Sequence, residues 1–274
     1  MMKVCIITVN YNNSKLTCEL SKNVLTLFPK NGYELYVVDN NSRENDKVNL
    51  DTISNSTVFF SKENTGYFQG VNLALKKINT SKFDYVVVCN NDITFHEDFY
   101  RYLVENHYNN DVYAVSPRII DADGFDQNPM VENIISRKRV FFYDIYYKNY
   151  FFGQFIYKLW QKIKRCINKP LQADFSRYIF MGYGAVYILT KPFFEGNKIL
   201  DTPPFIMGEE AFLANQINKS GGKIFFDHRL IVYHKDHSTC AKLPTKVLYN
   251  ITKDSYKIYR NIILRLPPID KVVG

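Results

Sequence analysis

Short apolar runs alternate with helix-like patterns between Val4 and Asn109, and this alternation restricts the fold more than any other feature. Four runs are typical of strands: Val4–Val9, Leu35–Val38, Val58–Phe60 and Tyr85–Val88. Amphipathic stretches at Ser14–Leu27, Phe68–Ile78 and Glu97–Asn109 predict helices. Because strands that alternate with helices are joined by right-handed crossovers, we expect an α/β fold with a mostly parallel central sheet flanked by helices.

The last third of the chain returns to regular patterns after a less regular middle. GAVYILTK at 184–191 predicts a strand, and residues 209–220, stopped by two glycines, predict an amphipathic helix. Two further strands are expected at 223–226 and at 230–233. A basic C-terminal helix is expected from about 245 to 264.

Polar side chains follow three of the four early strands at their carboxyl ends. Such side chains can cap the next helix, and each cluster alone allows that interpretation. In parallel sheets, however, ligands bind beyond the carboxyl ends of the strands, so three clusters at one edge predict a polar site. The clusters are Thr8, Asn10, Tyr11 and Asn12; Asp39, Asn40, Asn41 and Ser42; and Asn90, Asn91 and Asp92.

Two common nucleotide-binding motifs are absent. A dinucleotide enzyme needs GxGxxG where the first strand turns into its helix, but this turn reads VNYNNSK. No GxxxxGK[ST] phosphate loop is found either.

The middle of the chain, residues 121–178, is aromatic and basic. From Phe151 to Lys169 apolar and cationic residues interleave at spacings that a helix sorts onto two faces. One interpretation is a helix on an anionic membrane, with Lys162, Lys164 and Arg165 at headgroup depth. The alternative is a helical subdomain that packs its aromatic side chains on the core.

Charge and cysteine content bear on partners and compartment. The net charge of +8 over 274 residues invites a nucleic-acid partner, but the cations cluster away from the polar strand edge, so we expect none. The N-terminal apolar run is too short for a signal peptide or a membrane span. Five scattered cysteines without a CxxC pair indicate reduced thiols. We therefore expect a cytoplasmic protein, at the inner face of the plasma membrane if the middle segment binds lipid.

Seven blocks, in order, resemble the family-2 glycosyltransferases with the GT-A fold, in their bacterial surface-polysaccharide, rhamnosyltransferase-like branch. They cover most of the chain outside the middle segment. The blocks are TVNYNN at 8–13, VVDNNS at 37–42, ENTGYFQGVNLAL at 63–75, VVVCNNDITF at 86–95, FMGYGAVYILTK at 180–191, GEEAFLANQINKSGGKI at 208–224 and VYHKDHST at 232–239.

The resemblance implies a divalent cation, Mg²⁺ or Mn²⁺, on the diphosphate of a nucleotide sugar. The family's Asp-x-Asp motif falls on Asn90, Asn91 and Asp92, so only Asp92 supplies a carboxylate. The resemblance makes His234 a further metal ligand, with His237 as its competitor. The structural alternative for Asp92 is the cap of a following helix.

The resemblance also implies a donor site for a UDP- or dTDP-sugar. Asp39 would accept a hydrogen bond from a pyrimidine imide, although a turn-forming role also explains it. The segment with Asn64, Gly66 and Gly70 would close over the nucleotide, although a helix-entry turn is also adequate. The implied donor-binding residues are Thr8, Asn10, Tyr11, Asp39, Asn41, Asn64, Gly66, Gly70, Asn90 and Asn91.

The acceptor hydroxyl must lose a proton as it attacks, which requires a base within reach. The family's Glu-Asp pair corresponds to Glu209 and Glu210, with Glu210 the leading candidate. Two acidic residues at a helix start also gain from the helix dipole alone. Gly182 and Gly184 would line the acceptor sugar, or serve only as turn glycines. A base opposite the leaving group implies inversion.

We therefore expect one GT-A domain that transfers a sugar to a glycan acceptor, lipid-linked, in cell-surface polysaccharide synthesis. Its parts are a nucleotide-sugar half (1–120), the aromatic and basic insert (121–178), an acceptor and catalytic half (179–240) and the C-terminal helix (241–274). A nucleotidyltransferase and a catalytically degenerate subunit are the alternatives. Oligomeric state is not predicted.

Overall fold

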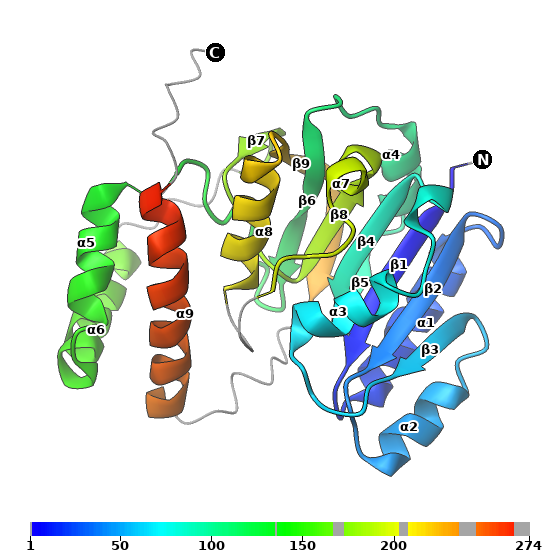
Figure 1. The fold of residues 1–274 in the computed structure, drawn as a ribbon, viewed down its shortest axis with the longest axis horizontal. Coiled ribbons are helices and arrows are strands. Elements are labelled where there is room, and N and C mark those ends of the chain that lie inside the picture. Colours follow the sequence, from blue (N-terminus) through cyan, green and yellow to red (C-terminus); the bar gives the residue numbers. More distant parts are fainter. Residues whose placement is uncertain (1, 135, 167–172, 203–207, 236–244, 266–274) are drawn as a thin grey trace.

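The computed structural model describes residues 2–134, 136–166, 173–202, 208–235 and 245–265 (Figure 1). In the helices α6 (Tyr150–Cys166) and α9 (Thr245–Arg265) it does not describe every side chain. Among the predicted site residues, His237 lies outside the described part of the chain, as do the side chains of Lys162, Lys164 and Arg165.

The first half of the chain forms a parallel sheet in the order β3-β2-β1-β4, which confirms the predicted α/β pattern. The helix predicted at 14–27 has the observed bounds. The helix predicted at 68–78 ends at Leu75, three residues earlier than expected. The elements are β1 (Val4–Asn10), α1 (Ser14–Leu27), β2 (Tyr33–Asp39), α2 (Glu44–Asp51), β3 (Ser56–Phe60), α3 (Tyr67–Leu75), a 3₁₀ turn (Thr80–Lys82) and β4 (Tyr85–Asn90).

The second half continues the same sheet through β4 in the order β8-β6-β9-β5, with β7 also paired to β9. β8 runs antiparallel to β4 and β6, while β6 and β9 are parallel, so the nine-stranded sheet is mixed and mostly parallel. The elements are β5 (Ile93–Phe95), α4 (Phe99–Glu105), β6 (Val112–Asp121), β7 (Arg177–Ile179), β8 (Val186–Thr190), α7 (Lys191–Gly196), α8 (Glu209–Lys219) and β9 (Lys223–His234).

The two strands expected at 223–226 and 230–233 are wrong, because one strand, β9, spans both. Its pairing with β6 shifts register between Pro117 and Arg118, where Asp227 pairs with the former and Ile231 with the latter. The intervening residues form a bulge. Their polar character had suggested a turn between two strands.

Helices cover both faces of the sheet, and each face has its own apolar core. Along β1, Ile7 packs toward α3 and α8, whereas Ile6 packs toward α1 and α4. This alternation follows from the two-residue period of a strand. The carboxyl ends of β1, β2 and β4 therefore emerge at one edge between two helical layers.

The middle segment folds into two helices that pack on the C-terminal helix beside the sheet (Figure 1). These are α5 (Arg137–Tyr146), α6 (Tyr150–Cys166) and α9 (Thr245–Arg265). Asp144 of α5 accepts two hydrogen bonds from Arg260 of α9, at 2.6 and 2.8 Å. Within the described residues, none of the helices combines the length and the apolar composition needed to cross a bilayer.

The helix α1 offers a test of this packing. Leu20 is 1% exposed in the core, while Leu25 on the same helix is 56% exposed. Leu20→Ala should lower the free energy of unfolding by about 2–5 kcal/mol, because it removes buried methyl groups and leaves a cavity. Leu25→Ala should change it by less than about 0.5 kcal/mol. Urea unfolding followed by circular dichroism measures both, and equal effects would contradict the assigned faces.

Candidate functional site

The carboxyl ends of the first strands meet as the sequence predicts. Asn10 pairs with Asp39 across β1 and β2, and Val9 pairs with Asn90 across β1 and β4. The Asn10 amide donates to Asp39 Oδ1 at 3.0 Å, and the Asn91 amide donates to Thr17 Oγ1 at 2.9 Å. The predicted polar edge therefore exists, and its members contact one another.

Much of this edge is satisfied by its own hydrogen bonds. Asp39 is fully buried, and its second oxygen accepts a hydrogen bond from the Ser42 amide at 3.0 Å, so it does form the turn. The side chain of Thr8 is also fully buried. Tyr11 and Asn41 are exposed at the edge, and Asn41 has a φ of 63°. Ligand contacts at this edge are therefore left mainly to the exposed side chains and to backbone groups.

A second segment is tied to the same edge by Asn40, a member of the predicted polar edge that was not among the implied donor-binding residues. The Asn40 amide donates to Asn64 Oδ1 at 2.8 Å and to the Gly66 carbonyl at 3.1 Å. Its oxygen accepts from the Thr65 amide at 3.1 Å. Gly66 precedes α3 with a φ of 89°, a left-handed conformation that favours glycine. Asn40 thus fixes the loop 64–66 over the end of β2.

The predicted nucleotide-facing glycine Gly70 has a different environment. It lies in α3 against β1, where an added Cβ would be 3.2 Å from both methyl carbons of Val9. Glycine there allows close approach of helix and sheet, so helix packing explains this residue without a ligand.

Asp92 and His234, the two predicted metal ligands, lie together. The short strand β5 follows Asp92 and pairs antiparallel with β9, so that Ile93 is opposite His234. His234 Nε2 lies 3.2 Å from Asp92 Oδ1, and both side chains are buried. The alternative role of Asp92 as a helix cap is wrong, because β5 follows it and α4 begins at Phe99.

The other ring nitrogen of His234 has a partner that the sequence did not indicate. Nδ1 lies 2.9 Å from Gln127 Oε1, in the segment after β6. With the Nδ1 proton donated to this oxygen, the lone pair of Nε2 faces the Asp92 carboxylate. Histidine ligands of metals are usually fixed in this way by a second hydrogen bond. The residues therefore fit a divalent cation, and a proton on the imidazole would compete with it.

Glu210 lies in the first turn of α8 against the loop before β8. The Gly184 amide donates to Glu210 Oε1 at 3.2 Å, and a Cβ on Gly184 would come within 2.6 Å of that oxygen. Burial raises the pKa of the Glu210 carboxyl, while its own amide and that of Gly184 oppose the shift. Glu209 is buried beside it. The absence of a side chain at Gly184 thus leaves room for the Glu210 carboxylate in this position.

Gly182 has a packing role. An added Cβ would lie 2.2 Å from Ser116 Oγ, a fully buried hydroxyl that accepts a hydrogen bond from Asn128.

Tyr67, the first residue of α3, carries a buried hydroxyl. Burial raises the pKa of this hydroxyl, and electrostatic interactions with Cys89, Glu209, Asp92 and Glu210 raise it further, in that order. Its buried hydroxyl has no hydrogen-bond partner among the described residues. Only its place in the block ENTGYFQG could have indicated it.

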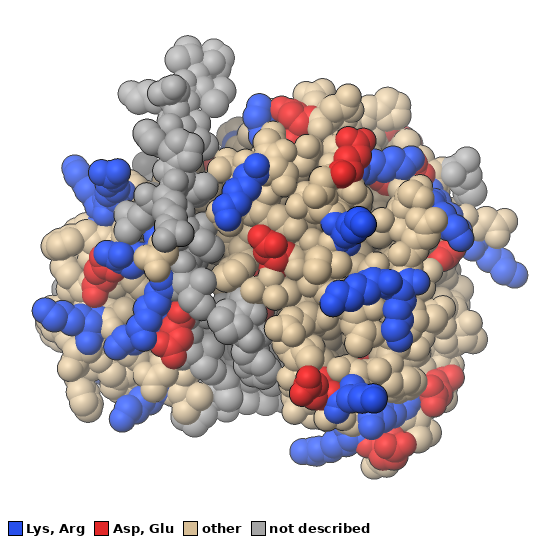
Figure 2. All heavy atoms as spheres, viewed as in Figure 1, with Lys and Arg blue, Asp and Glu red and all other residues tan. Residues whose placement is uncertain are grey.

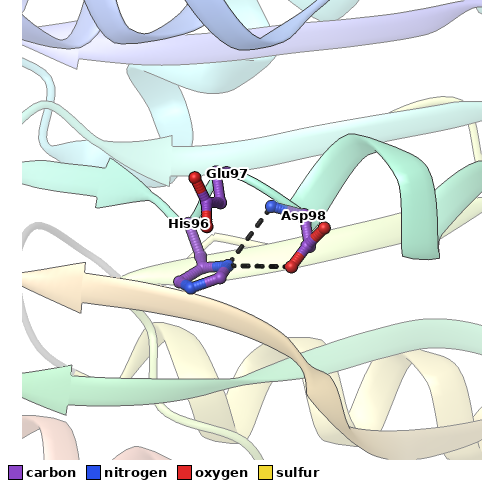
Figure 3. A group of neighbouring side chains, drawn as sticks. All are labelled: His96, Glu97 and Asp98. Atoms are coloured by element: carbon purple, nitrogen blue, oxygen red, sulfur yellow. Dashed lines mark hydrogen bonds and ion pairs between the residues drawn. The ribbon is translucent and has the colours of Figure 1, made fainter.

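A different acidic group, His96, Glu97 and Asp98, precedes α4 (Figure 3). His96 Nδ1 accepts the amide proton of Asp98 at 3.2 Å, which occupies its lone pair. Arg101 donates to Asp98 Oδ1 at 2.6 and 3.2 Å. These bonds organise the start of α4, and the Asp92 and His234 pair fits a cation better.

A protein-family model matches more than half of the chain. The family model described as Glycosyl transferase family 2 matches residues 5–180. No curated protein matches the sequence.

Several solved structures share the fold. Staphylococcus aureus TarS 1–349 in complex with UDP-GlcNAc has a TM-score of 0.60 at 14% identity, covering 96% of this chain and 67% of that one. GalNAc-T7 with UDP, GalNAc and Mn²⁺ gives 0.59 at 15% identity, over 98% and 52%. The mannosyltransferase PcManGT from Pyrobaculum calidifontis, with GDP-Man and Mn²⁺, gives 0.56 at 14% identity, over 96% and 73%. In a further TarS 1–349 structure, this chain spans 60% of that chain.

The contact between Gln127 and His234 can be tested by metal binding. Gln127→Leu should weaken Mn²⁺ binding about 10- to 100-fold, because the imidazole loses the partner that orients it. Titration of Mn²⁺ followed by electron paramagnetic resonance measures this directly. His96→Ala is the matched control and should leave the affinity unchanged. The reverse ranking would assign the ion to the group before α4.

The pKa of Glu210 supports a stability test. A folded-state pKa raised above that of the unfolded chain means that protonation stabilises the fold below the unfolded value, about 4.3, and that this contribution is lost as pH rises through the folded value. Glu210→Gln keeps an acceptor for the Gly184 amide and carries no charge. Its unfolding free energy relative to wild type should therefore increase from about pH 4 to pH 8.

The control for this test is Glu195→Gln, at an exposed position on α7. It should show no such increase. A Glu210→Gln difference that is independent of pH would show that burial does not perturb this carboxyl.

Proposed function

The chain belongs to glycosyl transferase family 2, and from this premise we propose that it transfers a sugar from a UDP- or dTDP-sugar to a hydroxyl group of a glycan, with inversion. One observation carries the proposal. Asp92 and His234 meet at the end of one half of the sheet, and the loop before β8 contacts both this pair and Glu210. The Tyr183 ring lies 5.8 Å from that of His234, and the adjacent Gly184 amide donates to Glu210. A group suited to a diphosphate-bound cation and a group suited to a base therefore adjoin the same loop.

The donor nucleotide is assigned to the polar edge formed by β1, β2 and β4. Tyr11 and Asn41 are exposed there, and the loop fixed by Asn40 adjoins them. Asp39, at the end of β2, is assigned to the pyrimidine base of the donor. Both of its oxygens already accept hydrogen bonds within the protein.

Asp92 and His234 would hold Mg²⁺ or Mn²⁺, which would neutralise charge on the donor diphosphate. Gln127 would keep Nε2 of His234 unprotonated toward that position. Imidazole is a better ligand for Mn²⁺ than for Mg²⁺.

Glu210 is assigned as the general base. Its raised pKa brings a carboxylate closer to neutral pH, where it accepts a proton from an attacking hydroxyl more effectively. The Gly184 amide donates to Oε1 and so helps to hold the carboxylate in place. The buried Tyr67 hydroxyl, which has no hydrogen-bond partner among the described residues, can donate to a substrate oxygen. Glu209, buried beside Glu210, is the second candidate for the base.

For the acceptor, we propose a lipid-linked glycan of cell-surface polysaccharide synthesis, at the cytoplasmic face of the membrane. The support is the likeness of the sequence blocks to the bacterial surface-polysaccharide branch. The rhamnosyltransferase-like donor rests on the same likeness.

Nucleotide release from UDP- or dTDP-sugars, with and without Mn²⁺, tests the whole proposal. Asp92→Asn and Glu210→Gln should each lower turnover at least about 100-fold, since one removes a charged ligand and the other the base. Asp98→Asn, in the group before α4, is the matched control and should retain turnover. Wild-type turnover in both site variants would refute the assignment.

A further inference from the structure

The helices α5 and α6 expose an unusual number of large apolar side chains. Their exposed fractions range from 50% to 78%. We call these residues the phenylalanine face: Phe141, Phe142, Phe151, Phe152 and Phe155. Single exposed apolar residues are normal on a protein surface, but a group of this kind marks an interaction site.

The inner side of the same segment packs half-buried tyrosines against α9 instead. Tyr147 stacks on Tyr256 of α9 at 4.9 Å between ring centroids, and Tyr150 packs edge-on against Tyr249 at 5.1 Å. The Tyr256 hydroxyl donates to the Val140 carbonyl at 2.9 Å, and the Tyr249 hydroxyl donates to the Tyr146 carbonyl at 3.0 Å. These two hydroxyls of α9 are thus satisfied by backbone carbonyls of α5.

Contact with water would favour the opposite arrangement, with tyrosines exposed and phenylalanines packed inside. A tyrosine can bond water at a surface, whereas a phenylalanine gains only by leaving water. The five phenylalanines are exposed, whereas four of the five tyrosines between residues 137 and 158 contact rings of α9; Tyr157, which is 46% exposed, is the exception. The outer surface of the segment is therefore suited to an apolar phase, not to solvent.

The charge of the neighbouring residues indicates which apolar phase this surface contacts. Exposed cations occur in the same two helices and in the turn between them, and Figure 2 shows basic side chains over this part of the molecule. The one acid between residues 136 and 158 is Asp144, whose oxygens are taken by Arg260. The exposed cations are Arg137, Lys138, Arg139, Lys148 and Lys158.

We propose that the outer surface of α5 and α6 docks on a bilayer that contains anionic lipid, with the phenylalanine face below headgroup level and the cations among the lipid phosphates. Anionic lipid attracts each nearby cation, and apolar burial adds to this attraction. A second copy of the chain would instead bring two basic surfaces together, which like-charge repulsion opposes. Docking itself does not depend on the proposed function. If the proposed function holds, docking would bring the enzyme to the membrane that carries a lipid-linked acceptor.

Vesicle flotation with the full chain tests the proposal. Wild type should bind vesicles that contain about 30% phosphatidylglycerol, and less so at high salt because surface charges are screened. Phe141→Ser with Phe151→Ser should lower the partition coefficient about tenfold or more. Lys138→Glu with Lys148→Glu should lower it on anionic vesicles and leave pure phosphatidylcholine unaffected.

Matched controls come from exposed residues elsewhere. Leu25→Ser with Val48→Ser removes apolar surface from α1 and α2, and Lys30→Glu with Lys198→Glu makes the same charge change as the lysine variant. Both should bind vesicles like wild type. Circular dichroism of every variant verifies that it is folded.

Three results would overturn the inference: no binding of wild type to anionic vesicles, unchanged binding of a folded phenylalanine variant, or a wild-type dimer that this variant converts to monomer in light scattering. The last result would assign the surface to a second copy. Nucleotide release without vesicles separates this inference from the proposed function. Its absence in a vesicle-binding wild type refutes the transferase alone, and its presence without vesicle binding refutes the docking surface alone.

Discussion

The contact between Asp92 and His234 depends on the register of the whole second half of the sheet. His234 is opposite Ile93 in β5 and opposite Asp121 in β6, so two neighbouring strands fix its position. A slip of one residue would turn its side chain to the other face of the sheet. The bulge in β9 after Asp227 sets this register, since it absorbs residues that a regular ladder would pair. An irregularity far along the strand therefore decides whether the imidazole reaches the carboxylate.

Most of the fold follows from apolar periodicity in the sequence, and the failures have physical causes. The helix at 14–27 was predicted with its observed bounds because its leucines and valine recur at helical spacing. The short α2 was missed because only Leu50 of it is buried, which leaves no period to detect. β5 has three residues, too few for a strand pattern. β9 was divided because its bulge is polar, and polarity alone does not distinguish a bulge from a turn.

For the site, the sequence indicates the residues that emerge from strands and misses those that come from loops. Asn10, Asp39 and Asp92 follow apolar runs, so their common edge could be predicted. Gln127 could not, because 107 positions separate it from His234 and only the pairing of β6 with β9 joins them. Family likeness also assigns Gly70 to the nucleotide, and its close approach to Val9 offers helix packing as a second explanation for a glycine there.

Hydrogen bonding divides the polar residues of the site into two groups. Asn10, Asp39 and Asn91 satisfy one another and their neighbours, so they fix the edge of the sheet and have little bonding capacity left for a substrate. Tyr67 differs, since its buried hydroxyl has no partner among the described residues, and burial of an unsatisfied hydroxyl destabilises a protein. Glu210 differs as well, since burial disfavours its charged form. A fold optimised only for stability would replace both with apolar residues, so their cost is best explained by a substrate that completes their hydrogen bonds.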